Sequence, residues 1–144
     1  MSFTREFEIV GGDFASAGRV STEIKAMLRG IGYPPDVIRR TAIASYEAEM
    51  NTVMYARRGS VRLGLEPGVI HLVFADEGPG IPDIGLAMQE GFSTATDEMR
   101  ERGFGAGMGL PNIQRNADRL EITSEVGRGT RLDITVLTDE EAGR

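Results

Sequence analysis

Apolar and acidic residues alternate at the start of the chain. Phe3, Phe7 and Ile9 share one side of an extended backbone, whereas Glu6 and Glu8 occupy the other side. This alternation is typical of a strand with one buried face, because successive side chains point to opposite sides of a sheet. The pattern therefore predicts a half-buried first strand that ends at the first pair of glycines.

Two amphipathic helices are predicted to follow. The first begins near residue 15 and ends within residues 30–34, and its apolar residues recur at intervals of three and four: Ala17, Val20, Ile24, Met27, Leu28 and Ile31. The second runs from Pro35 to about Ala56, because proline suits a first helical turn and the carboxylate of Asp36 suits the positive end of a helix. Its buried face is expected to carry Ile43, Met50 and Met54.

Four further strands and two further helices are predicted in the rest of the chain. The strand at 69–75 is almost continuously apolar, which favours a central position in the sheet. The other elements are strands at 61–65, 121–125 and 130–137, a short helix at 83–89, and a helix from Gly109 to about Leu120. This order predicts an α+β two-layer sandwich, in which helices cover one face of a mixed, mainly antiparallel sheet.

The length predicts one domain that spans residues 1–144. Residues 91–104 are polar, rich in Gly, Ser and Thr and weakly periodic, which predicts a mobile loop. Residues 138–144 form an acidic tail that is expected to fray.

The charge balance narrows the classes of partner. Lys and Arg number 16 against 22 Asp and Glu, a net charge of −6, which argues against a wide cationic surface for nucleic acid or anionic lipid. No apolar run approaches the length of a membrane span or of a signal-peptide core, so we expect a cytoplasmic protein.

Residue types that carry much enzyme chemistry are scarce in this chain. It has no cysteine, which excludes disulfides and thiol catalysis, and one histidine, His71, which leaves almost no material for His-rich metal sites or Ser/His/Asp triads. His71 lies in the middle of a predicted strand and is expected to be partly buried there.

Repeated glycines precede the helix predicted from Gly109. Backbone N–H groups in such a loop, together with the positive helix start, suit the binding of phosphate. Residues 103–109 nevertheless fail the dinucleotide pattern G-x-G-x-x-G, whose third glycine would be Met108 or Leu110. A P-loop is also excluded, because the only lysine, Lys25, lies in a helix without that loop. A phosphate site and a flexible loop with glycine turns remain as alternatives.

A second glycine-rich loop follows the apolar strand at 69–75. Asp76 shares a strand face with apolar residues of that strand, so its carboxylate is expected to be buried. A buried carboxylate needs a hydrogen-bond donor, and the exocyclic amine of adenine is a suitable one. Gly78 and Gly80 leave room for a flat base against the backbone. The alternative is a turn in which Asp76 accepts from local N–H groups.

The third candidate feature is a pair of polar residues on the second helix. Glu47 and Asn51 are four residues apart and therefore point the same way, whereas Glu49 lies roughly 200° from Asn51. At the margin of an apolar stripe a glutamate has a raised pKa and can act as a base. The amide oxygen of Asn51 suits Mg²⁺ that also binds phosphate oxygens. The alternative is an exposed, hydrogen-bonded pair.

Together these motifs resemble the N box and the two glycine boxes of the gyrase/Hsp90/histidine-kinase/MutL ATP-binding superfamily. The segments are Glu47-x-x-x-Asn51, Asp76-x-Gly78-x-Gly80, Gly105-x-Gly107-x-Gly109-Leu110 and a final Gly127-Arg128-Gly129-Thr130. The short length, the sequence of residues 76–84 and Gly91-Phe92-Ser93-Thr94 are most similar to bacterial anti-sigma-factor serine/threonine kinases, in particular the switch kinases that phosphorylate small STAS-domain proteins.

The resemblance implies a histidine-kinase-like ATPase fold with ATP and Mg²⁺ as cofactors. It implies that Asp76 accepts from the adenine amine with help from Thr130, that Asn51 holds Mg²⁺, and that residues 91–104 form an ATP lid. Glu47 would be the general base for a serine hydroxyl of the partner. The remaining expected nucleotide contacts are Gly78, Gly80, Arg102, Gly105, Ala106, Gly107, Met108, Gly109 and Leu110.

One departure from the family pattern concerns an arginine. Anti-sigma kinases often place it close before the second glycine box, where it reaches the γ-phosphate. Here Gly103 and Phe104 stand next to that box, with Arg100 and Arg102 further back, so the identity of the phosphate-binding arginine stays open.

Two functions fit these observations. The first is a serine/threonine protein kinase that phosphorylates a STAS-domain antagonist and thereby controls a sigma factor or signalling complex by partner switching. The second is a nucleotide-dependent binding module that sequesters a sigma factor or another regulator with little or no phosphate transfer. A motor role like that of gyrase or Hsp90 is disfavoured, because no transducer domain follows residue 144. The family also allows a homodimer.

Overall fold

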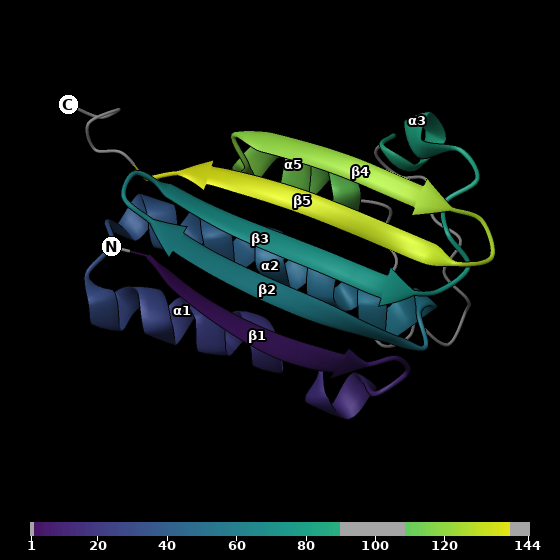
Figure 1. The fold of residues 1–144 in the computed structure, drawn as a ribbon, viewed down its shortest axis with the longest axis horizontal. Helices are drawn as coiled ribbons and strands as arrows, with labels where there is room; N and C mark the ends of the chain where they lie inside the picture. The colour runs from purple at the N-terminus through teal and green to yellow at the C-terminus, as the bar shows by residue number, and fades with distance from the viewer. Residues whose placement is uncertain (1, 90–108, 139–144) are drawn as a thin grey trace.

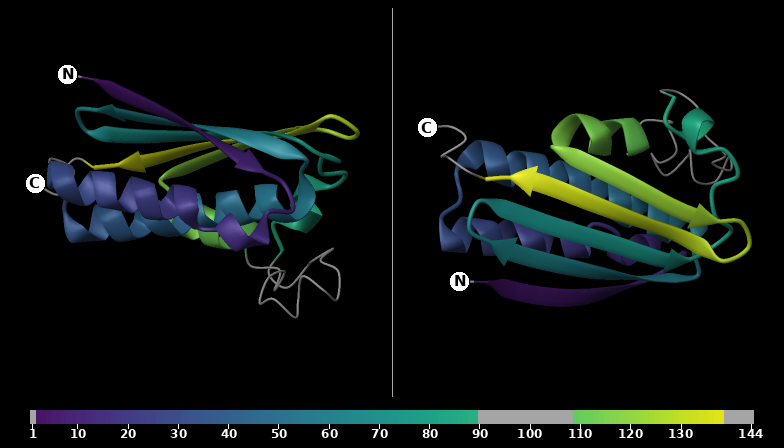
Figure 2. Two further views of the ribbon diagram at one scale, coloured as in Figure 1. Left: turned by 90° about the horizontal axis from the view of Figure 1, so that it is seen from below. Right: turned by 45° about the horizontal axis from the view of Figure 1, so that its top comes forward.

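The computed structural model describes residues 2–89 and 109–138. The sheet forms one layer and the long helices form the other, as Figure 1 shows from the sheet side and Figure 2 from the edge. The elements are β1 (Phe3–Val10), the 3-10 turn η1 (Phe14–Ser16), α1 (Arg19–Ile31), α2 (Pro35–Tyr55), β2 (Arg58–Glu66), β3 (Val69–Glu77), α3 (Ile84–Ala87), α5 (Gly109–Asn116), β4 (Arg119–Glu125) and β5 (Gly129–Leu137).

The five strands form one sheet in the order β1-β2-β3-β5-β4. The predicted α+β two-layer sandwich is confirmed, and β3 lies at the centre of the sheet as its apolar sequence indicated. Every strand pair is antiparallel, so among the described strands the sheet has no parallel member.

The core lies between the sheet and the helices. Alternate residues of the inner strands are buried, and they meet Val20, Ile24 and Leu28 of α1 together with Ala44 and Ala48 of α2. The strand residues of this core are Val61, Leu63, Leu65, Ile70, Leu72, Phe74, Leu132, Ile134 and Val136. Burial of these side chains drives the packing of helices against one face of the sheet.

The buried face of α2 differs from the one that the sequence pattern predicted. Met50 is buried, but Ile43 and Met54 are only half-buried, so the prediction was wrong for these two residues. The side that packs inward is rich in small residues such as Ala44, Ser45 and Ala48. Small side chains are weak signals in a hydrophobic pattern, although they let the helix pack closely.

Two predicted helix boundaries move for local reasons. Gly18 adopts a left-handed conformation with φ of 96°, which separates the turn η1 from α1, so α1 begins at Arg19 and not near residue 15. At the other boundary, α5 ends at Asn116 and not at Leu120, because the Asp118 N–H donates to the Thr135 carbonyl at 2.8 Å and brings the chain into the sheet.

His71 is exposed, so the prediction that it is partly buried was wrong. It lies on β3 opposite Gly64 of β2 and Thr135 of β5, on the sheet face that the helices do not cover. The period of two along β3 places it there, because its neighbours Ile70 and Leu72 both point into the core.

Two segments of the chain predicted to be mobile fall mostly beyond the described residues. The predicted lid at 91–104 lies wholly outside them, as does the tail from residue 139. Thr138, the first residue of the expected tail, is buried and donates its N–H to the Gly68 carbonyl at 3.0 Å. None of the helices in the described part of the chain is long and apolar enough to cross a membrane.

Candidate functional site

Asp76 is the penultimate residue of β3, directly before the first glycine loop. It pairs with Gly59 across the sheet, and its Oδ1 accepts a hydrogen bond from the Thr130 N–H at 3.1 Å. Because Thr130 lies on another strand, the alternative of a purely local turn around Asp76 does not describe this contact. The second carboxylate oxygen has no hydrogen-bond donor among the described residues, so it can accept one from a ligand.

Partial burial of Asp76 changes the pKa of its carboxyl. Removal of the carboxyl from water raises its pKa above the ordinary value for aspartate, and the Thr130 N–H partly offsets this because it stabilises the ionised form. A partly desolvated carboxylate gains more from a further N–H donor than an exposed one does.

Glycines hold the loops around Asp76 in close contact. A Cβ on Gly129, whose φ is 156°, would lie 1.9 Å from the Asp76 carbonyl oxygen. A Cβ on Gly80, whose φ is 78°, would lie 2.5 Å from the Glu125 carbonyl oxygen. The Gly78 N–H also donates to the Arg128 carbonyl at 3.1 Å. The first glycine loop and the β4–β5 turn are therefore one packed unit.

Ser124 belongs to this unit, although the sequence analysis did not single it out. Its Oγ accepts the Ile81 N–H at 2.7 Å and lies 2.9 Å from the hydroxyl of Thr130, its cross-strand partner. Thr130 thus bonds Asp76 through its backbone and Ser124 through its side chain. The only sequence signal for Ser124 was its place opposite Thr130 in a predicted hairpin.

Glu47 lies on α2 and faces α5. Its Oε2 accepts a hydrogen bond from the Asn112 side-chain amide at 3.0 Å, and the Oδ1 of Asn112 accepts one from Arg115 at 2.9 Å. Burial raises the pKa of the Glu47 carboxyl, and the Asn112 donor partly lowers it again. Glu47 is therefore half-buried and held by its neighbours, unlike the exposed surface pair that was the alternative interpretation.

The first residue of α5 lies beside both polar residues of α2. A Cβ built on Gly109 would be 3.3 Å from the Asn51 amide oxygen and 3.6 Å from Glu47 Oε1. The positive end of α5 therefore lies beside the Glu47/Asn51 pair, and a helix start is a favourable place for a phosphate. Leu110 is buried in the core, so only its backbone could contact a nucleotide.

The Asp76 region and α2 meet at Gly59. A Cβ on this residue would lie 2.7 Å from Thr52 Cγ2 and 3.4 Å from Asp76 Cβ. Thr52 follows Asn51 along α2, so the three motifs converge at one end of the molecule. In Figure 1 the end of β3, the end of α2 and the β4–β5 turn lie at that same end.

Glu49 has a structural role that the sequence analysis missed. Its buried carboxylate accepts the N–H groups of Gly18, Val20 and Ser21 at 3.0, 3.1 and 2.9 Å. These groups form the start of α1, where a helix has N–H groups without partners of its own and a positive end. Glu49 thus ties α2 to α1 and does not reach the site around Glu47.

The residues of the site suit a nucleotide whose Mg²⁺ is held largely by phosphate. The described residues contain no group of three or more His, Cys, Asp or Glu side chains that could cage a metal. Mg²⁺ bound with phosphates and water needs only one or two protein oxygens, and the Asn51 amide oxygen beside the α5 start could supply one. A side chain at Gly109 would crowd that oxygen.

Several predicted nucleotide contacts lie outside the described residues. They are Arg102, Gly105, Ala106, Gly107 and Met108. Their assignment stays a prediction.

Comparison with known proteins agrees with this arrangement. Residues 12–136 match the family described as the histidine kinase-like ATPase domain. The chain is 33% identical to the serine/threonine-protein kinase RsbT of Bacillus subtilis over 99 residues, which cover 65% of this chain and 67% of that protein. It is 32% identical to the anti-sigma F factor of Geobacillus stearothermophilus over 109 residues, which cover 76% of this chain and 64% of that factor, slightly less than two thirds.

A solved structure supports the same fold. The mycobacterial sensor histidine kinase MprB superposes with a TM-score of 0.56 at 18% identity, over 94% of this chain and 97% of that one. This superposition shows the fold, and the match over residues 12–136 shows that the chain belongs to the histidine kinase-like ATPase domain family.

Proposed function

We propose that this protein is an ATP-dependent serine/threonine protein kinase that phosphorylates a STAS-domain antagonist in a partner-switching pathway. The observation that carries the proposal is the environment of Glu47. Its carboxylate is half-buried, has a raised pKa, accepts from Asn112 and lies beside Asn51 and the start of α5. A base in that position can accept a proton close to where phosphate is bound.

Each residue of the site has a distinct task in this reaction. The free oxygen of Asp76 accepts the adenine amine, and the N–H groups at the start of α5 bind phosphate. The Asn51 amide oxygen holds Mg²⁺, which neutralises charge on the phosphates when it is bound. Glu47 accepts the proton of the partner's hydroxyl as that oxygen attacks the γ-phosphorus and ADP leaves.

The similarity to a protein named serine/threonine-protein kinase RsbT supports the kinase proposal. The similarity to an anti-sigma F factor favours a second candidate, a module that binds nucleotide and sequesters a sigma factor or another regulator with little phosphate transfer. The two candidates share the nucleotide site and differ in whether Glu47 is needed.

One experiment separates the two candidates. The purified protein is incubated with γ-labelled ATP and each STAS-domain protein of its own organism, beside Glu47→Gln and Asp76→Asn variants. The kinase proposal expects label on a STAS protein that Glu47→Gln abolishes while ATP binding is retained. Partner capture that survives Glu47→Gln but not Asp76→Asn, without label transfer, would establish the binding module instead. Equal transfer by Glu47→Gln would refute the role of Glu47 as the base.

A further inference from the structure

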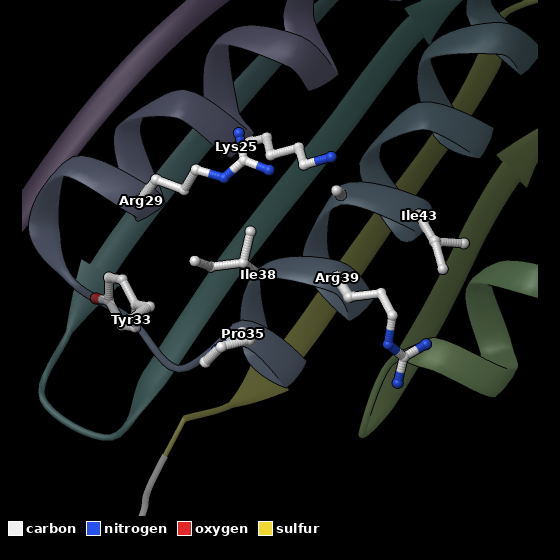
Figure 3. A pocket seen from close by; sticks show the side chains of 8 residues that line it. Lys25, Arg29, Tyr33, Pro35, Ile38, Arg39 and Ile43 are labelled. Atoms are coloured by element: carbon white, nitrogen blue, oxygen red, sulfur yellow. The ribbon is translucent and has the colours of Figure 1, made fainter.

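A groove lies between the C-terminal half of α1 and the N-terminal half of α2, at the end of the helices remote from the candidate nucleotide site. Figure 3 shows it on the outer side of the helix pair. Its volume is about 520 Å³, and the residues that line it are Lys25, Arg29, Tyr33, Pro35, Ile38, Arg39, Ala42 and Ile43. The lining combines an apolar floor with cationic side chains and includes no carboxylate.

The two cations of α1 that line the groove have no acidic partner in the part of the chain that the structure describes. Lys25 and Arg29 are four residues apart on the helix, so their like charges lie on one face, and neither forms an ion pair with a described residue. The single carboxylate of α1, on Glu23, pairs with Arg5. The charges of Lys25 and Arg29 are therefore available to an anion from outside.

Arg39, the cation of α2 that lines the groove, already has an acidic partner. Arg39 pairs with Asp36 at 2.6 Å, and Asp36 also accepts from Arg40 at 3.0 Å. Between the charged side chains, Ile38 forms the floor, and Tyr33 and Pro35 close the end where α1 joins α2. Burial raises the pKa of the Tyr33 hydroxyl, so this ring stays neutral beside the two cations.

We propose that this groove docks an acidic, amphipathic segment of a partner protein. One apolar side chain of that segment would pack over Ile38, and its carboxylates would lie between Lys25 and Arg29. The protein carries a net charge of −6, which disfavours an acidic partner overall, whereas the unpaired charges of Lys25 and Arg29 beside an apolar floor give this groove local charge complementarity to one. An amphipathic helix that lies in the groove between two helices is a common mode of peptide recognition.

The groove is separated from the nucleotide site. Ile38 precedes Asn51 on α2 by between three and four helical turns, a distance of about 20 Å. A partner could therefore be held at the groove while nucleotide occupies the other end. This inference does not depend on the proposed kinase activity, because it needs neither ATP nor Glu47.

The test uses a short fluorescein-labelled amphipathic peptide of Leu and Glu, with a Leu and Lys peptide of the same pattern as control. We expect the Glu peptide to raise fluorescence anisotropy when the full chain is titrated, and salt to weaken this binding; any binding of the Lys peptide to the acidic surface should not be weakened by Lys25→Glu/Arg29→Glu. In ¹⁵N spectra the shifted amides should cluster at Lys25, Arg29 and Ile38. The charge reversal Lys25→Glu/Arg29→Glu should weaken binding by about tenfold or more.

A matched control is available on the open face of the sheet. Arg62→Glu/Arg119→Glu changes the net charge by the same amount on two exposed arginines and should leave peptide binding within about twofold. Circular dichroism checks that both double variants are folded. Weaker binding of the Lys peptide to the groove variant, an unchanged affinity of that variant for the Glu peptide, or shifted amides elsewhere would overturn the proposal.

Other occupants of the groove are outcomes of the same test. Sedimentation of the chain alone reports a second copy, and co-sedimentation with phosphatidylglycerol vesicles reports a membrane surface. If either association occurs and is abolished by Lys25→Glu/Arg29→Glu, while the Glu peptide does not bind, the acidic partner segment is refuted.

Discussion

Replacement of Asp76 by asparagine separates nucleotide binding from folding. The two side chains have the same shape, but the amide has one acceptor oxygen and one donor NH₂ group. In the native chain one carboxylate oxygen accepts the Thr130 N–H at 3.1 Å and the other is left for a ligand. An asparagine amide in this position must direct its NH₂ group at one of the two donors, the Thr130 N–H or the adenine amine, whichever way it is rotated.

The magnitude of the binding loss follows from this mismatch. A hydrogen bond to a charged group contributes about 1.5–3 kcal/mol, and its loss corresponds to a fall in affinity of roughly tenfold to a hundredfold. We therefore expect Asp76→Asn to weaken ATP binding by about that factor in isothermal titration calorimetry. The matched control is Asp133→Asn. The carboxylate of Asp133 pairs with Arg131 on the same strand as Thr130 and lies away from the site. ATP affinity within about twofold of the native value in Asp76→Asn would refute the adenine assignment.

Stability should change in the opposite direction. Burial raises the pKa of Asp76 in the folded chain above its ordinary value, so the protonated carboxyl stabilises the fold and this contribution is lost as pH rises through the folded pKa. At pH 7 the ionised, half-buried carboxylate is therefore unfavourable, and Asp76→Asn removes it. Without nucleotide, the variant should melt at the same temperature as the native protein or higher. A large drop in the melting temperature would show instead that the carboxylate is a structural requirement.

Three further predictions concern glutamates of α2. Glu47→Gln should lower the rate of phosphate transfer by at least about a hundredfold with little change in ATP affinity, measured by label transfer to the STAS partner and by calorimetry. Asn112→Ala removes the donor to Glu47 Oε2 and therefore raises the pKa of Glu47 further. The acid limb of the pH–rate profile should then move to higher pH. An unmoved limb would argue against a positioning role for Asn112. Glu49→Ala leaves three N–H groups at the start of α1 without their acceptor and should lower the free energy of unfolding by about 3 kcal/mol in urea titration, whereas a change under about 1 kcal/mol would contradict the capping role.

Local pattern was sufficient for much of the fold. The alternation along β1, the apolar run of β3, the spacing of apolar residues in α1 and the proline at the start of α2 each depend on a few neighbouring residues. The same locality explains why Asp76 could be assigned to the end of a buried strand. It also explains the error at α2, where small residues pack inward and half-buried residues such as Ile43 carried the stronger hydrophobic signal.

The contacts that hold the site were beyond the reach of local pattern. Asn112 meets Glu47 from 65 positions away, and Thr130 meets Asp76 from 54 positions away. Neither pairing leaves a periodic trace along the chain, because both depend on how α5 packs on α2 and how β5 lies beside β3.

The sequence by itself determined which residue types were available for chemistry and the order of the helices and strands. It also located the two glycine loops and the Glu47/Asn51 pair on the second helix. Helix periodicity already favoured Glu47 over Glu49, but only the tertiary structure decided what packs against each of them: the start of α5 against Glu47 and the start of α1 against Glu49. The physical reason is that side-chain direction follows from local helix geometry, whereas burial and hydrogen-bond partners come from distant segments that meet only in the folded chain.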